Sequence, residues 1–295
     1  MFQVEQAMEK VCLWMGSGEI PAGLPFQVTA VGVCDEKLMI FTAASILKPP
    51  VKAFLGTLGI EAGDNDIELQ VGRFSPLCYS GGSVTGGGAL DGGTLGCFVE
   101  ETKGAGPYYF ITAEHAVAGA VPSKGPVTCG GGHQGKLVGT GGLFPLPKVA
   151  KVDCALVSTA RPALGPHARC AGSPMFTGNT SPPDQVKVVS KCGFSSGSTR
   201  GKICSPKGCV LVEFRNGDKV LFEDQIIVES DGGRFAAPGD SGAIVVSEDS
   251  GKEGNAVGLL FAGTVVGDFF AANPMEVVIS VLEKASAKKL YIVTA

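Results

Sequence analysis

The sequence predicts a mostly β protein in which two small antiparallel β-barrels follow a small N-terminal α+β domain and precede a C-terminal helix. From Thr94 onward, short apolar runs alternate with glycine turns, a pattern typical of small barrels. A connection rich in proline and glycine, residues 160–184, would join a first barrel at about 94–160 to a second barrel at about 185–272. The length of 295 residues also suits two or three packed units better than one core.

Residues 1–80 are expected to form the N-terminal α+β domain. Apolar positions at helical spacing between Val4 and Met15 predict a helix with one buried face. Asp35 and Glu36 would form the turn between two strands, and Pro49-Pro50 is expected to break the chain. The expected elements are a helix over 3–15, strands over 26–34 and 37–43, a helix over 51–58 and a strand over 67–74.

Residues 81–93 form a glycine-rich connector between this domain and the barrels. We expect a plain linker rather than a mobile segment near a cleft. The connector is not a phosphate-binding loop, because no Gly-Lys-Ser or Gly-Lys-Thr follows.

The C-terminal helix is expected over about 274–289. Asn273 would cap it and Pro274 would take its first position, both of which are favoured at helix starts. An apolar stripe at helical spacing should pack on the second barrel, and residues 290–293 could add a last strand.

A serine framed by glycines runs straight into an apolar strand at residues 238–246. The glycines let the backbone turn sharply, so that the amides of Gly239 and Ser241 can converge on one point where an oxyanion would form. Asp240 could carry the charge that holds the turn. The alternative interpretation is a tight turn before a buried strand.

A serine nucleophile needs a base, and the chain has three histidines. His115 ends an apolar strand, a rigid place to hold a catalytic group. His133 lies in a glycine loop and His167 in a proline-rich connection, where solvated loop histidines are expected.

The base in turn needs a carboxylate that fixes its tautomer. Asp153 heads a short apolar run over 151–157, whereas its competitor Asp184 sits in a proline turn and is expected to be solvated. The candidate triad then follows the chain order His115, Asp153, Ser241.

The segments around His115, Asp153 and Ser241 resemble the three catalytic motifs of trypsin/chymotrypsin-like serine peptidases. Segments 191–203 and 256–264 resemble the opening of the second barrel in bacterial members and the strand that lines the substrate cleft. Segments 93–99 and 271–274 are similar to a cytosolic group of bacteria and plants, the NARROW LEAF-like peptidases. Glu114 departs from the secreted members, which usually have alanine there, and we expect it to have little effect. The matching motifs are Thr112-Ala113-Glu114-His115, Asp153-Cys154-Ala155-Leu156 and Gly239-Asp240-Ser241-Gly242.

The resemblance implies a chymotrypsin-like protease domain over 94–295, with two six-stranded antiparallel barrels, that hydrolyses a protein or peptide substrate. Ser241 would attack the peptide carbonyl, His115 would transfer the proton, and Asp153 would orient the imidazole. No metal and no organic cofactor is expected. Because no segment resembles the Arg-Ile-Val-Gly-Gly start of tryptic zymogens, regulation is expected through the N-terminal domain or a partner bound to it.

The same resemblance indicates the residues of the substrate pocket. Phe235, six residues before the nucleophile, would form its floor, with walls from Phe261, Ala262 and Gly263. Asp268 lies where the returning strand would pass behind the pocket, so it is either a solvated turn residue or a partner for a basic side chain. We expect an apolar or small P1 residue, because a buried Lys or Arg without a charge partner is costly.

Composition argues against nucleic acid or an anionic membrane as a partner, because charged residues make up only 18% and the net charge is −4. No run is long enough to span a membrane, and the first residues lack the basic and apolar regions of a signal peptide. These features predict a cytoplasmic protein.

The ten cysteines are expected to be mainly reduced, because Cys34, Cys97 and Cys154 fall inside apolar strand patterns. The spacing between cysteines does not suggest a zinc site.

Two other classes of function remain open. A peptidase-fold binding module could keep the triad residues without activity. A viral polyprotein-processing protease would use the same chemistry.

Overall fold

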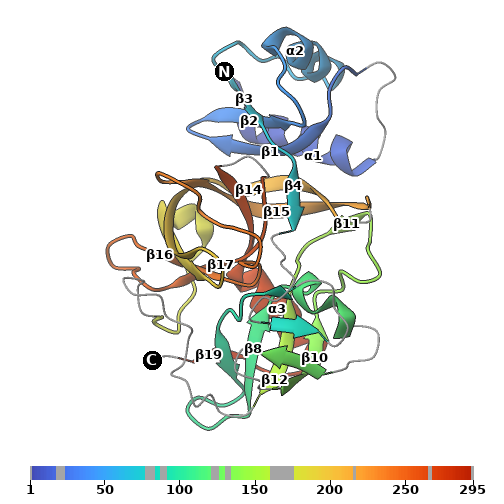
Figure 1. Cartoon of the computed structure of the whole chain (residues 1–295). Coiled ribbons are helices and arrows are strands. Elements are labelled where there is room, and N and C mark those ends of the chain that lie inside the picture. The colour runs from blue at the N-terminus through green and yellow to red at the C-terminus, as the bar shows by residue number, and fades with distance from the viewer. Residues whose placement is uncertain are drawn as a thin grey trace.

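The structure, a computed structural model, describes residues 2–17, 24–76, 84–86, 92–120, 126–129, 134–159, 176–214, 217–264 and 268–293. Figure 1 shows the N-terminal unit at the top, the second barrel in the middle and the first barrel at the bottom. Strands predominate. In the part of the chain that is described, no helix has the length and apolar character needed to cross a membrane.

The N-terminal unit contains two helices and three strands. Asp35 and Glu36 adopt positive φ of 47° and 62° at the hairpin turn, as expected from their position between the two strands. The second helix begins at Lys48, so Pro49-Pro50 lies in its first turn instead of breaking the chain, where proline loses no intrahelical hydrogen bond. The elements are α1 (Val4–Ser17), β1 (Val28–Cys34), β2 (Lys37–Thr42), α2 (Lys48–Thr57) and β3 (Ile67–Val71).

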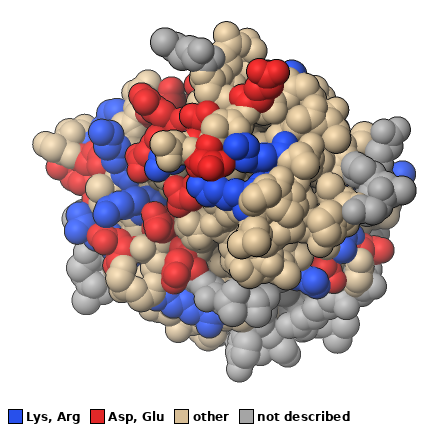
Figure 2. Space-filling model, turned by 90° about the horizontal axis from the view of Figure 1, so that it is seen from above, with Lys and Arg blue, Asp and Glu red and all other residues tan. Residues whose placement is uncertain are grey.

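The unit has its own core, in which Val11, Ile40 and Leu55 are fully buried between the helices and the sheet. β1 and β2 pair antiparallel, whereas β2 and β3 pair parallel across α2. On the face viewed in Figure 2, acidic and basic side chains are interspersed. The N-terminal unit contains the ion pair Lys52–Asp64 at 2.9 Å.

The second barrel is closed by its own strand pairings. Its strands follow the order β15-β18-β17-β16-β13-β14, and β14 pairs again with β15 to complete a six-membered ring. Fully buried side chains such as Val228, Val245 and Phe270 fill its interior. Its strands are β13 (Val188–Gly193), β14 (Gly197–Glu213), β15 (Lys219–Ser230), β16 (Ile244–Ser247), β17 (Ala256–Thr264) and β18 (Phe269–Pro274).

The first barrel is an eight-stranded sheet in the order β19-β7-β8-β12-β10-β9-β5-β6. Val84–Gly86 and Gly92–Gly93, which fall within the glycine-rich stretch 81–93, pair in this sheet as β5 and β6. The remaining strands are β7 (Phe98–Glu100), β8 (Tyr108–Thr112), β9 (Pro126–Cys129), β10 (Gln134–Thr140), β12 (Ala155–Thr159) and β19 (Tyr291–Ile292). The predicted fold class is therefore confirmed.

The N-terminal unit continues the sheet of the second barrel. β1 pairs antiparallel with the distal half of β14, with Ala30 opposite Val210. β4 (Phe74–Pro76) pairs with both β14 and β17, and β11 (Val149–Ala150) pairs parallel with β15. One sheet of eleven strands thus runs from β3 through the second barrel to β11.

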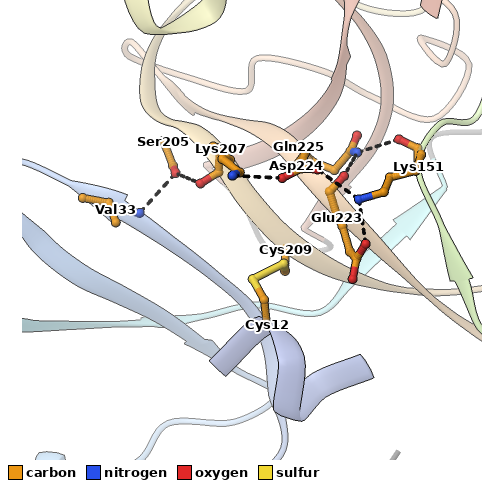
Figure 3. The surroundings of a disulfide bond; sticks show 9 residues. All are labelled: Cys12, Val33, Lys151, Ser205, Lys207, Cys209, Glu223, Asp224 and Gln225. Atoms are coloured by element: carbon orange, nitrogen blue, oxygen red, sulfur yellow. Dashed lines mark hydrogen bonds and ion pairs between the residues drawn. A yellow bond between two sulfur atoms is a disulfide. The ribbon is translucent and has the colours of Figure 1, made fainter. Parts of the chain in front are cut away.

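A disulfide between Cys12 and Cys209 joins α1 to β14 across 197 residues of sequence (Figure 3). Cys192 is also disulfide-bonded. The expectation of mainly reduced cysteines missed these bonds, because helical spacing presents Cys12 as a core residue and only the tertiary fold brings it to β14. Cys34, Cys97 and Cys154 are free thiols, as expected, but only Cys97 and Cys154 are buried.

The C-terminal helix α3 (Met275–Ser286) packs on both barrels, not on the second barrel alone as expected. Val278 and Leu282 lie in one cluster with Ile111 of the first barrel and Leu259 of the second. The expected Asn273 cap is wrong, because β18 extends through Pro274 and the helix begins at Met275. Residues 291–292 form the last strand, which pairs with β7 of the first barrel.

Candidate active site

Ser241 lies in a tight turn that precedes β16 and contacts the first barrel. Gly239 and Gly242 adopt positive φ of 104° and 95°, a conformation that other residues rarely take. A Cβ on Gly242 would lie 2.2 Å from the carbonyl oxygen of Thr94. The Thr94 amide donates to the Ser241 carbonyl at 2.6 Å, and its hydroxyl donates to the Gly239 carbonyl at 2.8 Å. The first barrel therefore clamps the turn, and position 242 requires glycine.

His115, Asp153 and Ser241 form a hydrogen-bonded chain. His115 begins a short 3-10 helix (His115–Ala120) just after β8, and Asp153 lies just before β12. Ser241 Oγ lies 2.9 Å from Nε2 of His115, and Asp153 Oδ2 lies against Nδ1 of the same ring. The other carboxylate oxygen of Asp153 accepts the His115 backbone amide at 3.0 Å. All three residues are buried, with at most 2% of their surface exposed, so the chain is sheltered from water.

Asn273 holds Asp153 in place. Its side-chain oxygen accepts the Asp153 amide at 3.0 Å, and its side-chain nitrogen donates to the carbonyls of Asp153 and Leu259 at 3.3 Å each. The residue expected as a helix cap therefore ties β18 to the loop before β12. The sequence signal that could have revealed this contact is a single polar residue at the end of the apolar run Phe269–Ala272.

Two backbone amides beside Ser241 are unpaired. The amides of Asp240 and Gly242 donate to the carbonyls of Ala237 at 3.0 Å and Leu260 at 2.8 Å. Among the described residues, no acceptor lies on the amides of Gly239 and Ser241. Unpaired N–H groups next to a nucleophile can stabilise a developing oxyanion.

Asp240 is held by a buried network centred on Lys191. The Lys191 ammonium lies 3.1 Å from Asp240 Oδ2, and neither side chain is exposed. The backbone amides of Ser195 and Ala237 donate to the same carboxylate at 2.8 and 2.9 Å. Burial lowers the pKa of Lys191, and the negative charge of Asp240 opposes this shift. The sequence indicated that Asp240 could hold the turn but did not identify Lys191 as its partner.

Glu114, expected to have little effect, anchors the loop between β10 and β12 of the first barrel. Its carboxylate accepts the amides of Leu143 at 2.9 Å and Phe144 at 3.2 Å, and the residue is fully buried. Burial, with a smaller contribution from the nearby Asp153 charge, raises the pKa of Glu114 to about 7. A second titratable carboxyl group therefore lies beside the triad.

The expected pocket residues fall into two environments. The rings of Phe235 and Phe261 are buried in the barrel core, at 5.5 Å from Phe270 and 4.7 Å from Phe222. Ala262 and Gly263 lie on the part of β17 that pairs with β4. Asp268 is exposed at a bend before β18.

In the part of the chain that the structure describes, no alternative to His115 or Asp153 contributes to the site. Asp184 is exposed in a short 3-10 helix (Pro183–Gln185). His133 and His167 lie outside the described residues.

The chain matches no known family model and no curated protein sequence. It is similar to several solved structures at low identity. A glutamic acid-specific serine protease is 20% identical, with 72% of this chain and 98% of that chain covered and a TM-score of 0.49. Protease A of Thermobifida fusca is 19% identical, with 72% and 98% covered and a TM-score of 0.43. A chymotrypsin of Cellulomonas bogoriensis is 19% identical, with 73% and 98% covered and a TM-score of 0.45. The resemblance to the NARROW LEAF-like peptidases stays a prediction from the sequence.

Proposed function

We propose that the protein is a serine endopeptidase whose nucleophile is Ser241. The observation that carries the proposal is the buried chain Asp153–His115–Ser241, which ends beside the two unpaired amides of Gly239 and Ser241. A structural turn alone does not call for a buried imidazole between a carboxylate and a hydroxyl.

In the proposed reaction, Nε2 of His115 takes the hydroxyl proton as Ser241 Oγ attacks the peptide carbonyl. The tetrahedral oxyanion accepts hydrogen bonds from the amides of Gly239 and Ser241, each worth roughly 3 kcal/mol in the transition state. His115 then returns the proton to the leaving amine, and water hydrolyses the acyl-enzyme by the same steps. Asp153 keeps the Nδ1 proton in place and stabilises the imidazolium.

The experiment is labelling with a fluorophosphonate, followed by turnover of a peptide library. Ser241→Ala, His115→Ala and Asp153→Asn are each expected to lower turnover by about 10⁴-fold or more with unchanged circular dichroism. Ser250→Ala, at an exposed serine, is the matched control. Labelling that persists in Ser241→Ala would exclude this nucleophile. A folded wild type that resists both the probe and the library would favour the catalytically silent binding module.

For specificity, we propose that the enzyme prefers an apolar or small P1 residue. Phe235 is an uncharged, buried ring and offers no partner for a Lys or Arg side chain. Peptides that differ only in Leu, Ala, Lys or Arg at P1 should be cleaved fastest with Leu or Ala. A strong Lys or Arg preference that disappears in Asp268→Asn would reverse this assignment. Cleavage confined to one extended sequence would instead point to polyprotein processing.

A further inference from the structure

The two edges of β17 have different partners near the nucleophile. One edge pairs with β18 as far as Gly263. The other edge pairs with β16, and the last hydrogen bond along it runs from the Gly242 amide to the Leu260 carbonyl at 2.8 Å. The next carbonyl, that of Phe261, lies 3.1 Å from Ser241 Oγ. Beyond Phe261, the edge of β17 that faced β16 has no partner in β16, and it would be unpaired without a further strand.

β4 of the N-terminal segment fills this edge. It pairs antiparallel with β17, with Pro76 opposite Ala262 and Ser75 opposite Gly263. In this register, a strand continued by one residue past the Ala262 partner would lie opposite Phe261, whose carbonyl contacts the nucleophile. An extended peptide on the same edge would therefore deliver its next carbonyl to Ser241. Added strands of this kind are a general way to bind peptides.

We propose that β4 occupies the edge on which extended peptide substrates bind, so that the N-terminal segment inhibits the site in cis. The inference rests on the proposed function of Ser241. In this arrangement, β4 is the competitor that a substrate must displace from the edge of β17.

The contacts of β4 are strong at one end and weak at the other. Phe74 is fully buried, with its ring 5.5 Å from Phe41, and it pairs with Val212 of β14. Pro76 has no amide proton, so it cannot donate to the β17 edge. The end of β4 nearest the nucleophile is thus the end that can open while Phe74 stays in place.

The test compares two probes of Ser241 in full-length protein. A small fluorophosphonate needs only the nucleophile and the oxyanion amides, whereas a tripeptidyl phosphonate also needs the β17 edge. Ser75→Pro removes the amide at the centre of β4, and Ser75→Ala keeps it as the matched control. Proline at the centre of β4 weakens its pairing with β17, which should raise the tripeptidyl labelling rate by about tenfold in Ser75→Pro. The fluorophosphonate rate should be unchanged in both variants.

Equal tripeptidyl rates in Ser75→Pro and wild type, with fluorophosphonate labelling intact, would overturn the inhibition but not the nucleophile. Hydrogen exchange provides a second measurement that needs no variant. In wild type, the amides of residues 74–75 should exchange faster after tripeptidyl labelling than after fluorophosphonate labelling. Identical exchange in the two adducts would also overturn the proposal.

A separate observation concerns two thiols at the junction of β1 and β14. The Val33 amide donates to Ser205 Oγ at 3.1 Å (Figure 3). Cys34 and Cys204 are the chain neighbours of these two residues and lie at the same junction. Both cysteines are free, and their thiols are in hydrogen-bonding contact. Cys34 is half-buried, whereas Cys204 is buried.

We further propose that Cys34 and Cys204 form a redox-responsive cross-link between β1 and β14, closed by a low-molecular-weight disulfide. The Cys34 thiolate attacks one sulfur of the reagent, which releases one reagent thiol and leaves a mixed disulfide. Cys204, after losing its proton, attacks the Cys34 sulfur and releases the second thiol. The interaction with Cys204 lowers the pKa of Cys34, which suits the half-buried thiol as the attacking one.

Peptide mapping after incubation with oxidised glutathione tests this cross-link. The peptides that contain Cys34 and Cys204 should be recovered as one linked species, while Cys97 and Cys154, both buried, stay free and serve as the matched control. In Cys34→Ser, Cys204 should remain a free thiol. Recovery of Cys34 and Cys204 as separately alkylated peptides from the treated wild type would overturn the proposal.

Discussion

At the scale of single residues, Lys191 controls the shape of the nucleophile turn through its buried ion pair with Asp240. Lys191→Met should lower the free energy of unfolding by about 3 kcal/mol or more, because it leaves a buried carboxylate without its counter-ion. Fluorophosphonate labelling of Ser241 should also slow, since Asp240 lies between the two proposed oxyanion donors. Urea unfolding and labelling rates measure both effects.

Lys202→Met is the matched control, because this lysine is exposed on β14 and lies 4.0 Å from Asp231. Surface pairs of this kind contribute little. A Lys191→Met variant as stable and reactive as Lys202→Met would show that the buried pair is dispensable.

Glu114 should make stability depend on pH near neutrality. Its pKa rises from 4.5 to about 7 on folding, so the folded state holds the proton between these values and the unfolded state does not. Stability from this group is therefore present below pH 4.5 and is lost as pH rises to about 7. Glu114→Gln should remove this loss. The free energy of unfolding of the variant, relative to that of wild type, should therefore increase by on the order of 3 kcal/mol between pH 5 and 8.

Urea unfolding at the two pH values measures the difference, with Glu61→Gln at an exposed acid as the control. An unchanged pH dependence in Glu114→Gln would mean that the buried carboxyl group keeps its ordinary pKa.

Site residues that lie in a local sequence motif could be predicted, whereas residues that act through contacts distant in the sequence could not. His115, Asp153 and Ser241 carry local patterns, a strand end or a glycine turn, and the structure brings them together. Asn273 and Lys191 act through partners 120 and 49 residues away. Such contacts depend on strand pairing, which no local pattern specifies.

At the scale of elements, the link between α1 and β14 is covalent. The free energy of unfolding of the double variant Cys12→Ala/Cys209→Ala should be about 3 kcal/mol lower than that of wild type under oxidising conditions. Without the disulfide, the long loop between the two cysteines is no longer closed in the unfolded state, which raises the entropy of that state. In excess reductant the difference should largely disappear. A constant difference in both conditions would mean that cavity formation, not the disulfide, is responsible.

The helices and strands of the N-terminal unit could be predicted because their apolar spacing is regular, as in β2 and α2. The start of α3 could not. Asn273 and Pro274 favour a helix start, but hydrogen bonding to Asp153 and pairing with Gly258 keep both residues in β18. Tertiary contacts thus outweighed the local capping preference.

At the scale of the whole molecule, periodicity indicates the barrels but not how the units join. The pattern divides the chain near residue 80, whereas the pairing of β1 with β14 makes one continuous sheet across that division.

The continuous sheet has a consequence for how the chain is made. α1 and β1 are synthesised before β14, because Cys209, the partner of Cys12, follows it by 197 residues. At about 5–20 residues per second, this delay is roughly 10–40 seconds. During this time β1 presents an open edge and α1 an unpaired thiol, both of which invite pairing with other chains. The order of synthesis therefore places the most exposed step of folding at the N-terminal unit, long before a proteolytic site exists.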